Sequence, residues 1–246
     1  MSLKLSQVVA VVLAGGFGTR VAHLLAGVPK PMVPVADKPF LEWVVRWLAR
    51  QGIRKVILST GHLADVVESH FRAQPVAGVV TRCLAETRPL GTGGGFLNAA
   101  RLSGETPEAW LVVNGDSLVF ANLALAVAEL SNPAVAGAVI GCEMADASRY
   151  GTLAIAPAGE LRGFTEKRPG KGIINAGAYL LRDSLVRQFP GTLPLSFEQE
   201  VFPQLVARGC LLKVCTVDAP FLDIGTPESL RQAKSFIAQN RAQFCD

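Results

Sequence analysis

The chain has 246 residues, of which 50% are hydrophobic and 18% are charged, and its formal net charge is +4 at pH 7. High hydrophobicity with low charge excludes an intrinsically disordered chain, which cannot bury enough apolar surface to fold. The 24 Lys and Arg residues are scattered along the sequence, so the basic stripe typical of nucleic-acid-binding proteins is missing and we expect no nucleic-acid partner.

Membrane insertion and secretion are both disfavoured by the apolar segments. No apolar run approaches the ~18 residues that a membrane-spanning helix needs. The early run from Val8 to Ala14 leads into glycines rather than into a signal-peptide cleavage site. The five cysteines are odd in number and form no C-x-x-C pair, which favours reduced thiols and a cytoplasmic location.

The first half of the chain alternates strand and helix patterns. Val8 to Leu13 is apolar and rich in β-branched residues, as in a strand buried on both faces. The predicted strands are 8–13, 55–59, 78–81 and 110–113, and the predicted helices are 40–50, 63–72 and 96–102. This alternation indicates βαβ units, and hence a doubly wound, mostly parallel α/β sheet with helices on both faces.

The second half is less regular and richer in strands. Strands are predicted at 135–143, 173–181 and 211–217, with a hairpin over 152–165 that turns at Ala158-Gly159. Ser196 to Gln199 resembles a capping box that opens a helix toward Arg208, and a closing helix is predicted at 227–240 with proline at its first position. Because no linker or repeat is visible, we expect a single domain over 1–246.

A glycine-rich loop follows the first predicted strand. Residues 13–20 read Leu-Ala-Gly-Gly-Phe-Gly-Thr-Arg, and such glycines let the backbone approach a ligand and point amide N–H groups at an anion. Val21 stands where a dinucleotide-binding fingerprint needs its last glycine, and no Gly-Lys-Ser/Thr occurs in the chain. A phosphate-binding loop and a tight structural turn both stay open.

Lys30 lies between Pro29 and Pro31, which fix the backbone on either side of it. Taken alone, this segment is typical of a surface loop with a solvated lysine. Together with the glycine-rich loop and Arg20, it would direct backbone amides, a guanidinium group and an ammonium group at one polyphosphate.

These two segments resemble the sugar-1-phosphate nucleotidyltransferase family. Further segments agree with the family in the same order, at 86–94 (E-x-x-P-L-G-T-G-G), 114–116 (N-G-D), 166–167 (E-K), 175–177 (N-A-G) and 221–227 (F-L-D-I-G-T-P). Within the family, K-P-F-L-E at 38–42 and S-F-E at 196–198 are most similar to bacterial D-glycero-α-D-manno-heptose 1-phosphate guanylyltransferases. One departure is that residues 21–25 read V-A-H-L-L, where many relatives have L-x-P-L-T.

The resemblance implies an enzyme that transfers a nucleoside monophosphate, GMP from GTP, to a sugar 1-phosphate, D-glycero-α-D-manno-heptose 1-phosphate. The products would be a sugar nucleotide for bacterial surface polysaccharide synthesis and pyrophosphate. It also implies a nucleotide-binding half over 1–141 and a small β-rich, sugar-phosphate-binding half over 142–246. Mannose-1-phosphate guanylyltransferase, N-acetylmuramate-1-phosphate uridylyltransferase and a non-catalytic sugar-nucleotide-binding regulatory subunit are the alternatives, and a homo-oligomer stays open.

The resemblance also assigns site residues. Arg20 and Lys30 are the expected catalytic residues. The nucleotide would be bound by Leu13, Ala14, Gly15, Gly16, Gly18, Thr19, Glu86, Gly91 and Thr92. The sugar phosphate would be bound by Asn114, Gly151, Glu166, Lys167, Asn175, Ala176 and Gly177.

Mg²⁺ is the expected cofactor, held by Asp116 and Asp223. Each of these aspartates follows a strand-like apolar stretch, and open α/β sheets bind ligands at the carboxyl ends of their strands. Two carboxylates suffice, because Mg²⁺ keeps several waters and takes only one or two protein ligands beside substrate phosphates.

Glu86 is the residue expected to select the base. A carboxylate can only accept hydrogen bonds, and guanine offers two adjacent donors, N1–H and N2–H₂. The alternative is that Glu86 caps the turn at Pro89 and that backbone amides alone select the base.

Overall fold

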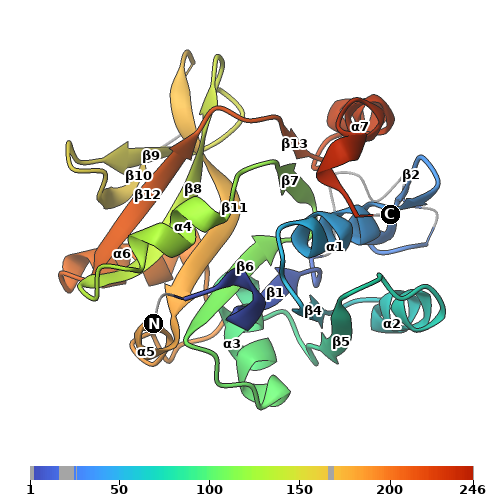
Figure 1. Ribbon diagram of the computed structural model, residues 1–246, viewed down its shortest axis with the longest axis horizontal. Helices are drawn as coiled ribbons and strands as arrows, with labels where there is room; N and C mark the ends of the chain where they lie inside the picture. The colour runs from blue at the N-terminus through green and yellow to red at the C-terminus, as the bar shows by residue number, and fades with distance from the viewer. Residues whose placement is uncertain (1–2, 17–24, 26, 166–168, 246) are drawn as a thin grey trace.

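The computed structural model describes residues 3–16, 25, 27–165 and 169–245 (Figure 1). Its central feature is a nine-stranded sheet in the order β10-β9-β11-β6-β1-β4-β5, to which β8 is added beside β11 and β12 beside β8. The strands of this sheet are β1 (Val9–Leu13), β4 (Lys55–Thr60), β5 (Val80–Ala85), β6 (Ala109–Asn114), β8 (Val135–Met144), β9 (Thr152–Ile155), β10 (Leu161–Thr165), β11 (Gly172–Arg182) and β12 (Leu211–Val217).

The sheet is parallel in the first half of the chain and mixed in the second. Strands β6, β1, β4 and β5 are parallel neighbours, as the alternating sequence pattern predicts. Strand β11 runs antiparallel to both β6 and β8 and joins the two halves into one sheet. The second half is the β-rich portion that the resemblance implies.

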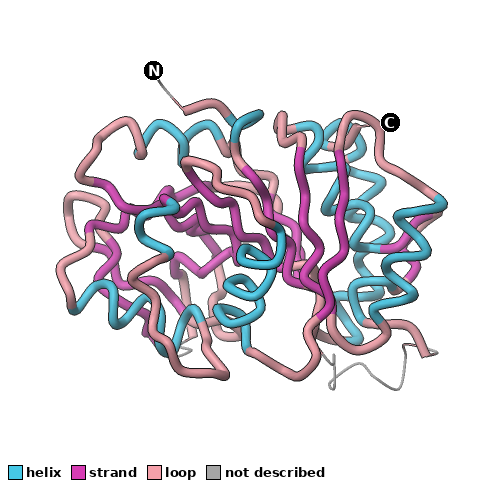
Figure 2. Tube along the Cα trace, turned by 90° about the horizontal axis from the view of Figure 1, so that it is seen from below, coloured by secondary structure: helices cyan, strands magenta, loops and turns pink. Residues whose placement is uncertain are grey.

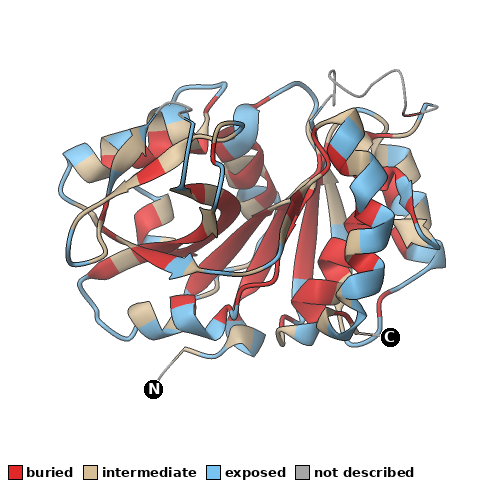
Figure 3. Ribbon diagram, turned by 90° about the horizontal axis from the view of Figure 1, so that it is seen from above, coloured by how far each residue is buried: buried red, intermediate tan, exposed pale blue. Residues whose placement is uncertain are grey.

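Helices cover both faces of the sheet, as Figure 2 shows. They are α1 (Phe40–Arg50), α2 (Ala64–Ala73), α3 (Gly91–Ser103), α4 (Ala124–Glu129), α5 (Asp183–Val186), α6 (Phe202–Ala207) and α7 (Pro227–Gln239). Alternate residues of a strand point to opposite faces. Ala10 and Val12 of β1 therefore pack in the core that contains α1, whereas Val9 and Val11 pack in the core that contains α3. The strands between these cores are buried on both faces (Figure 3).

Helix α3 begins at Gly91, five residues before its predicted start at Phe96. Glycine is a weak helix former, so the run of glycines in this first turn gave no helical pattern in the sequence. A Cβ atom at Gly94 would come within 2.8 Å of the Leu193 side chain, and one at Gly93 within 3.0 Å of Val201. The glycines are therefore required for close packing rather than for flexibility.

Several short elements had no counterpart in the prediction. They are the hairpin strands β2 (Pro34–Val35) and β3 (Lys38–Pro39), the strands β7 (Ser117–Val119) and β13 (Phe221–Asp223), and helices α4 and α5. Short strands lack a clear period of two and depend on tertiary pairing. Of these, β7 and β13 matter most, because they lie at the candidate site.

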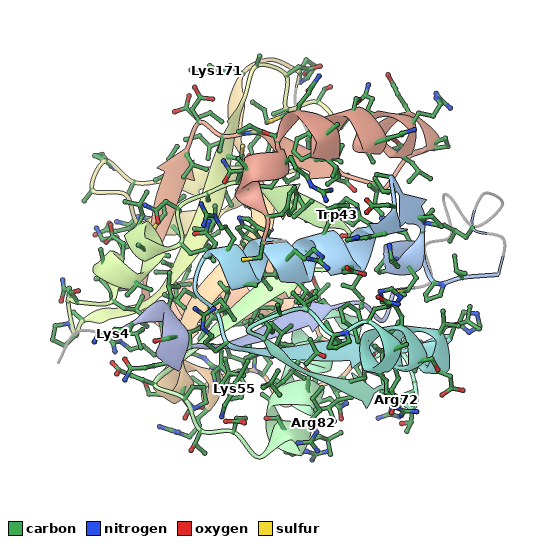
Figure 4. The ribbon with its side chains drawn as sticks, turned by 45° about the vertical axis from the view of Figure 1, so that its right-hand side comes forward. Lys4, Trp43, Lys55, Arg72, Arg82 and Lys171 are labelled. Carbon is green, nitrogen blue, oxygen red and sulfur yellow. The ribbon has the colours of Figure 1, made fainter. Side chains whose placement is uncertain are left out.

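The C-terminal segment packs against α1, beside Trp43 (Figure 4). The Trp43 ring lies 5.0 Å from the ring of Phe244, and its indole N–H donates to the Val35 carbonyl. Trp43 and Trp47 are both fully buried packing residues. All five cysteines are free thiols. In the described part of the chain, no helix has the length and apolar character needed to cross a membrane.

Candidate active site

Five of the expected site residues lie outside the described residues: Gly18, Thr19, Arg20, Glu166 and Lys167. The assignments of these residues stay predictions. The others lie in or directly after β1, β5 and β6, on α3, on β11 and on β13. Lys30 begins a 3₁₀ turn, and Gly151 immediately precedes β9.

A two-stranded sheet brings Asp116 and Asp223 together. Strands β7 and β13 pair antiparallel, with Asp223 opposite Ser117, and the Ile224 N–H donates to the Asp116 carbonyl at 3.0 Å. Asp116 follows β6 by two residues, so it lies at the carboxyl end of a central strand, where open α/β sheets bind ligands. The two expected metal carboxylates are therefore neighbours, although Asp116 and Asp223 are 107 positions apart in the chain.

Lys30 completes this cluster. Its ammonium nitrogen lies 2.6 Å from Oδ2 of Asp116, which makes a charge-assisted hydrogen bond. Pro31 extends the 3₁₀ turn that begins at Lys30, and the Val33 N–H donates to the Lys30 carbonyl. The short turn thus fixes the backbone from which the Lys30 side chain reaches Asp116.

The electrostatics of the cluster are unfavourable for Asp223. Burial is the main cause that raises the pKa of the Asp223 carboxyl, and the like charge of Asp116 raises it further. Lys30, the Gly225 N–H and Arg149 act in the opposite direction. A partly buried carboxylate pair with one lysine is an arrangement that an additional cation would stabilise.

The described part of the glycine-rich loop is tied to its neighbours by backbone hydrogen bonds. The Ala14 N–H donates to the Ser59 carbonyl at 2.8 Å, and the Gly115 N–H donates to the Leu13 carbonyl at 2.9 Å. A Cβ atom at Gly115 would lie only 2.7 Å from the Leu13 carbonyl oxygen. This close approach places the loop beside Asp116, so the expected nucleotide-binding and metal-binding segments meet.

Glu86 is half-buried at the other side of the loop. Its Oε2 accepts from the Leu90 N–H at 3.1 Å, and its Oε1 accepts from the Ser59 hydroxyl at 3.3 Å. Burial raises the pKa of the Glu86 carboxyl, and these two hydrogen bonds partly oppose that rise. The hydrogen bond from Leu90 is the turn cap that the alternative interpretation of Glu86 requires. Glu86 also lies against the glycine-rich loop, since a Cβ atom at Gly15 would lie 3.0 Å from its Oε1.

Gly91 and Thr92 contact the segment of residues 195–197. Gly91 has φ +76°, and a Cβ atom there would lie 2.5 Å from the Leu195 carbonyl oxygen. That carbonyl accepts from the N–H groups of Gly93 and Gly94, and the Thr92 hydroxyl accepts from the Phe197 N–H. The close backbone approach at Gly91 is therefore made by this protein segment, and nucleotide binding by Gly91 and Thr92 stays a prediction.

Asn175, Ala176 and Gly177 form a break in the register of β11. The pairing of β11 with β8 shifts between Asn175 and Tyr179, so the intervening residues bulge out of the ladder. Gly177 has φ +71° and packs directly against the Asn114 side chain. The expected sugar-phosphate residues of β11 therefore lie beside Asn114, which is two positions before Asp116 in the chain.

Gly151 immediately precedes β9, whose first residue, Thr152, pairs antiparallel with Ile174 of β11, next to Asn175. A Cβ atom at Gly151 would lie 3.4 Å from the carbonyl oxygen of Thr165, the last residue of β10. The structure therefore places Gly151 beside the end of the hairpin that leads to residue 166.

Two residues near the site were not identified from the sequence. Arg149 donates to the Thr226 hydroxyl at 3.2 Å, its guanidinium lies 5.4 Å from the centre of the Tyr150 ring, and its charge acts on Asp223. Glu198 accepts hydrogen bonds from Asn175, Tyr179 and Ser196. Only the S-F-E segment at 196–198, noted for its resemblance, pointed toward Glu198.

A profile of the nucleotidyl transferase family matches residues 9–240. The chain is 35% identical over 223 residues to D-glycero-alpha-D-manno-heptose 1-phosphate guanylyltransferase of Campylobacter jejuni, with coverage of 89% of this chain and 95% of that protein. It is 37% identical to mannose-1-phosphate guanylyltransferase of Mycobacterium tuberculosis, but it spans 62% of that protein's length.

Solved structures agree with these relatives. HddC from Yersinia pseudotuberculosis, crystallised in complex with GMP-PN, is 33% identical and has a TM-score of 0.80, with 92% of this chain and 97% of that chain covered. A putative glucose-1-phosphate thymidylyltransferase from Bacillus anthracis is 22% identical and shares the fold with a TM-score of 0.79, over 95% of this chain and 96% of that one. The fold, the profile and the relatives agree, and the chain belongs to the nucleotidyl transferase family.

Proposed function

We propose that this protein transfers GMP from GTP to D-glycero-α-D-manno-heptose 1-phosphate, giving a sugar nucleotide and pyrophosphate. The observation that carries the proposal is the cluster of Lys30, Asp116 and Asp223 beside the glycine-rich loop. The guanylyltransferase relatives of C. jejuni and Aneurinibacillus thermoaerophilus support the choice of substrates, since this chain covers 95% and 96% of their lengths.

The reaction needs no covalent enzyme intermediate, because a sugar 1-phosphate oxygen is itself a competent nucleophile. It would attack the α-phosphorus of the triphosphate in line and expel pyrophosphate. Catalysis then consists mainly of positioning and of stabilising charge. Lys30 lowers the repulsion between the two anionic substrates, and by resemblance Lys167 does the same at the sugar phosphate. Arg20 and the loop amides hold the departing phosphates.

The carboxylate pair fits Mg²⁺. Within the described residues, no group of three or more His, Cys, Asp or Glu side chains could hold a metal ion. A pair of carboxylates is nevertheless what Mg²⁺ takes when substrate phosphates and waters complete its coordination. Asp116 and Asp223 would hold the ion, which would supply charge stabilisation at the reacting phosphates. The raised pKa of Asp223 supports this assignment, because a bound cation would relieve the repulsion between the two carboxylates.

Base selection is assigned to Glu86. Its two oxygens accept from Leu90 and Ser59, and each carboxylate oxygen can accept more than one hydrogen bond. Glu86 therefore keeps acceptor capacity for the N1–H and N2–H₂ groups of guanine while it caps the turn. Uracil offers one donor flanked by two carbonyls and pairs less well with a carboxylate.

Pyrophosphate release tests the proposal directly. Four nucleoside triphosphates, including GTP and UTP, are crossed with the 1-phosphates of heptose, mannose, glucose and N-acetylmuramic acid. We expect the highest kcat/KM for GTP with heptose 1-phosphate. Release only with mannose 1-phosphate would favour the second candidate, which the 37% identity to the mycobacterial relative supports. Binding of the sugar nucleotide without pyrophosphate release from any pair would instead indicate a regulatory subunit.

A further inference from the structure

The segment from Leu195 to Glu198 is anchored on α3. The Leu195 N–H donates to the Leu90 carbonyl, and the Leu195 carbonyl accepts from the first turn of α3. The Phe197 N–H donates to the Thr92 hydroxyl at 3.0 Å. These contacts fix the backbone immediately before Glu198 to the first turn of α3.

The Glu198 carboxylate joins this anchored segment to β11. Its Oε1 accepts from the Asn175 amide at 3.1 Å and from the Tyr179 hydroxyl at 3.2 Å, and its Oε2 accepts from the Ser196 hydroxyl at 3.1 Å. Burial, together with the nearby charge of Glu198, raises the pKa of Tyr179 well above its usual range. The Tyr179 hydroxyl therefore stays protonated and donates at neutral pH.

Asn175 connects the Glu198 carboxylate to the bulge of β11. Its side-chain amide also donates to the Tyr179 hydroxyl at 2.7 Å, so both of its N–H groups are used within the protein. Its Oδ1 accepts from the Gly177 N–H at 3.0 Å, and Gly177 in turn packs against Asn114. The side chain of Asn175 is thus committed to shaping the bulge.

We propose that Glu198 is a positioning residue for the sugar 1-phosphate, because it holds Asn175 and thereby the Asn175–Gly177 bulge beside Asn114. This inference rests on the proposed function. Glu198 itself need not touch the substrate, since its three hydrogen bonds are made to the protein. The segment from Leu195 to Glu198 is in turn anchored on α3, which fixes the position of the Glu198 carboxylate.

Initial rates with GTP and heptose 1-phosphate, each varied separately, test this role. Glu198→Ala leaves Asn175 and Tyr179 without their acceptor, so we expect KM for the sugar 1-phosphate to rise about tenfold or more. The KM for GTP should stay within about twofold, because a loss confined to sugar-side positioning removes no nucleotide contact. Glu198→Gln should restore most of the affinity, because its carbonyl can accept from both partners while its amide donates to Ser196.

Glu200→Ala is the matched control. Glu200 lies in the same turn and accepts from the Ser196 N–H at 2.6 Å, but Asn175 is held by Glu198. This control should leave both KM values unchanged even if the melting temperature falls. Should Glu198→Ala fail to fold, Tyr179→Phe keeps the aromatic ring, removes one donor and must raise KM for the sugar 1-phosphate selectively.

The outcomes are distinguishable. An equal rise in both KM values, or a lower melting temperature with unchanged kinetics, overturns the positioning role of Glu198. Absence of pyrophosphate release by the unmodified protein with every substrate pair overturns the proposed function, and this inference with it.

Discussion

The ammonium of Lys30 and the carboxylate of Asp116 form a 2.6 Å ion pair between residues 86 positions apart in the chain. The Lys30 side chain is only 11% exposed, whereas that of Asp116 is 37% exposed. The lysine is therefore held beneath a carboxylate that stays open to ligands. This pair, together with Asp223, places one positive and two negative groups where the proposed reaction brings phosphates.

Replacing Asp116 should abolish turnover without unfolding the protein. Asp116→Asn removes one of two proposed metal carboxylates, which raises the barrier by several kcal/mol and lowers kcat about a thousandfold or more. Pyrophosphate release over a Mg²⁺ titration measures this effect, and circular dichroism checks the fold. Asp218→Asn, at an exposed position, is the control and should keep normal activity. Near-normal turnover of Asp116→Asn at modest Mg²⁺ would refute the metal assignment.

Lys30→Met keeps most of the stem of the side chain and removes its charge. Because a fixed cation at the reacting phosphates acts mainly on the transition state, kcat should fall on the order of a hundredfold, while KM rises less. Lys55→Met is a suitable control. Lys55 is the first residue of β4, at the end of the strand away from the candidate site, and forms an exposed ion pair with Glu105. A change in KM alone would mean that Lys30 binds ground state and transition state equally.

Asp223→Asn should make the protein more stable at neutral pH. The folded protein raises the pKa of Asp223, so above that pKa the ionised carboxylate opposes folding. An amide removes this penalty and still accepts from the Gly225 N–H, so the melting temperature should rise by a few degrees. The gain in melting temperature should shrink as pH falls through the pKa of Asp223. The Asp223 carboxyl of the unmodified protein then takes up a proton, more readily in the folded than in the unfolded state, and its penalty disappears. Melting curves from pH 4 to pH 8 measure this, and a gain independent of pH would contradict the explanation.

The unmodified enzyme should prefer GTP to UTP by about tenfold to a hundredfold in kcat/KM, since an unsatisfied buried polar group costs ~1–3 kcal/mol. Glu86→Gln should narrow this gap, because an amide can donate to a pyrimidine carbonyl. Ser59→Ala removes a hydroxyl that contacts Glu86 but keeps the carboxylate, so it should keep the preference. Equal use of UTP by the unmodified enzyme would show that Glu86 serves as the turn cap alone.

Long, strongly patterned elements could be predicted from the sequence. Helix α1 was predicted with its observed bounds, and β12 likewise, while β1 and α7 differ from their predictions by a single residue at one end. The N-cap at Ser196 is also confirmed, since its hydroxyl accepts from the Gln199 N–H. The reciprocal acceptor for the Ser196 N–H is Glu200 rather than Gln199, and the first turn that follows is a π-turn over Phe197–Val201. Local spacing specified the cap but not which neighbouring side chain would complete it.

Hydrophobic periodicity predicted the class of the fold, and the order of the motifs, through the resemblance to a family, named most candidate residues, because both are local properties of the chain. Tertiary structure decided which of these residues meet. The pairing of β7 with β13 places Asp223 beside Asp116, and strands of three residues are too short to show with which strand they pair. The acceptor that Glu198 supplies to Asn175 likewise depends on contacts between residues 23 positions apart. Such pairings form only when the surrounding sheet and helices have fixed both partners, so no local pattern encodes them.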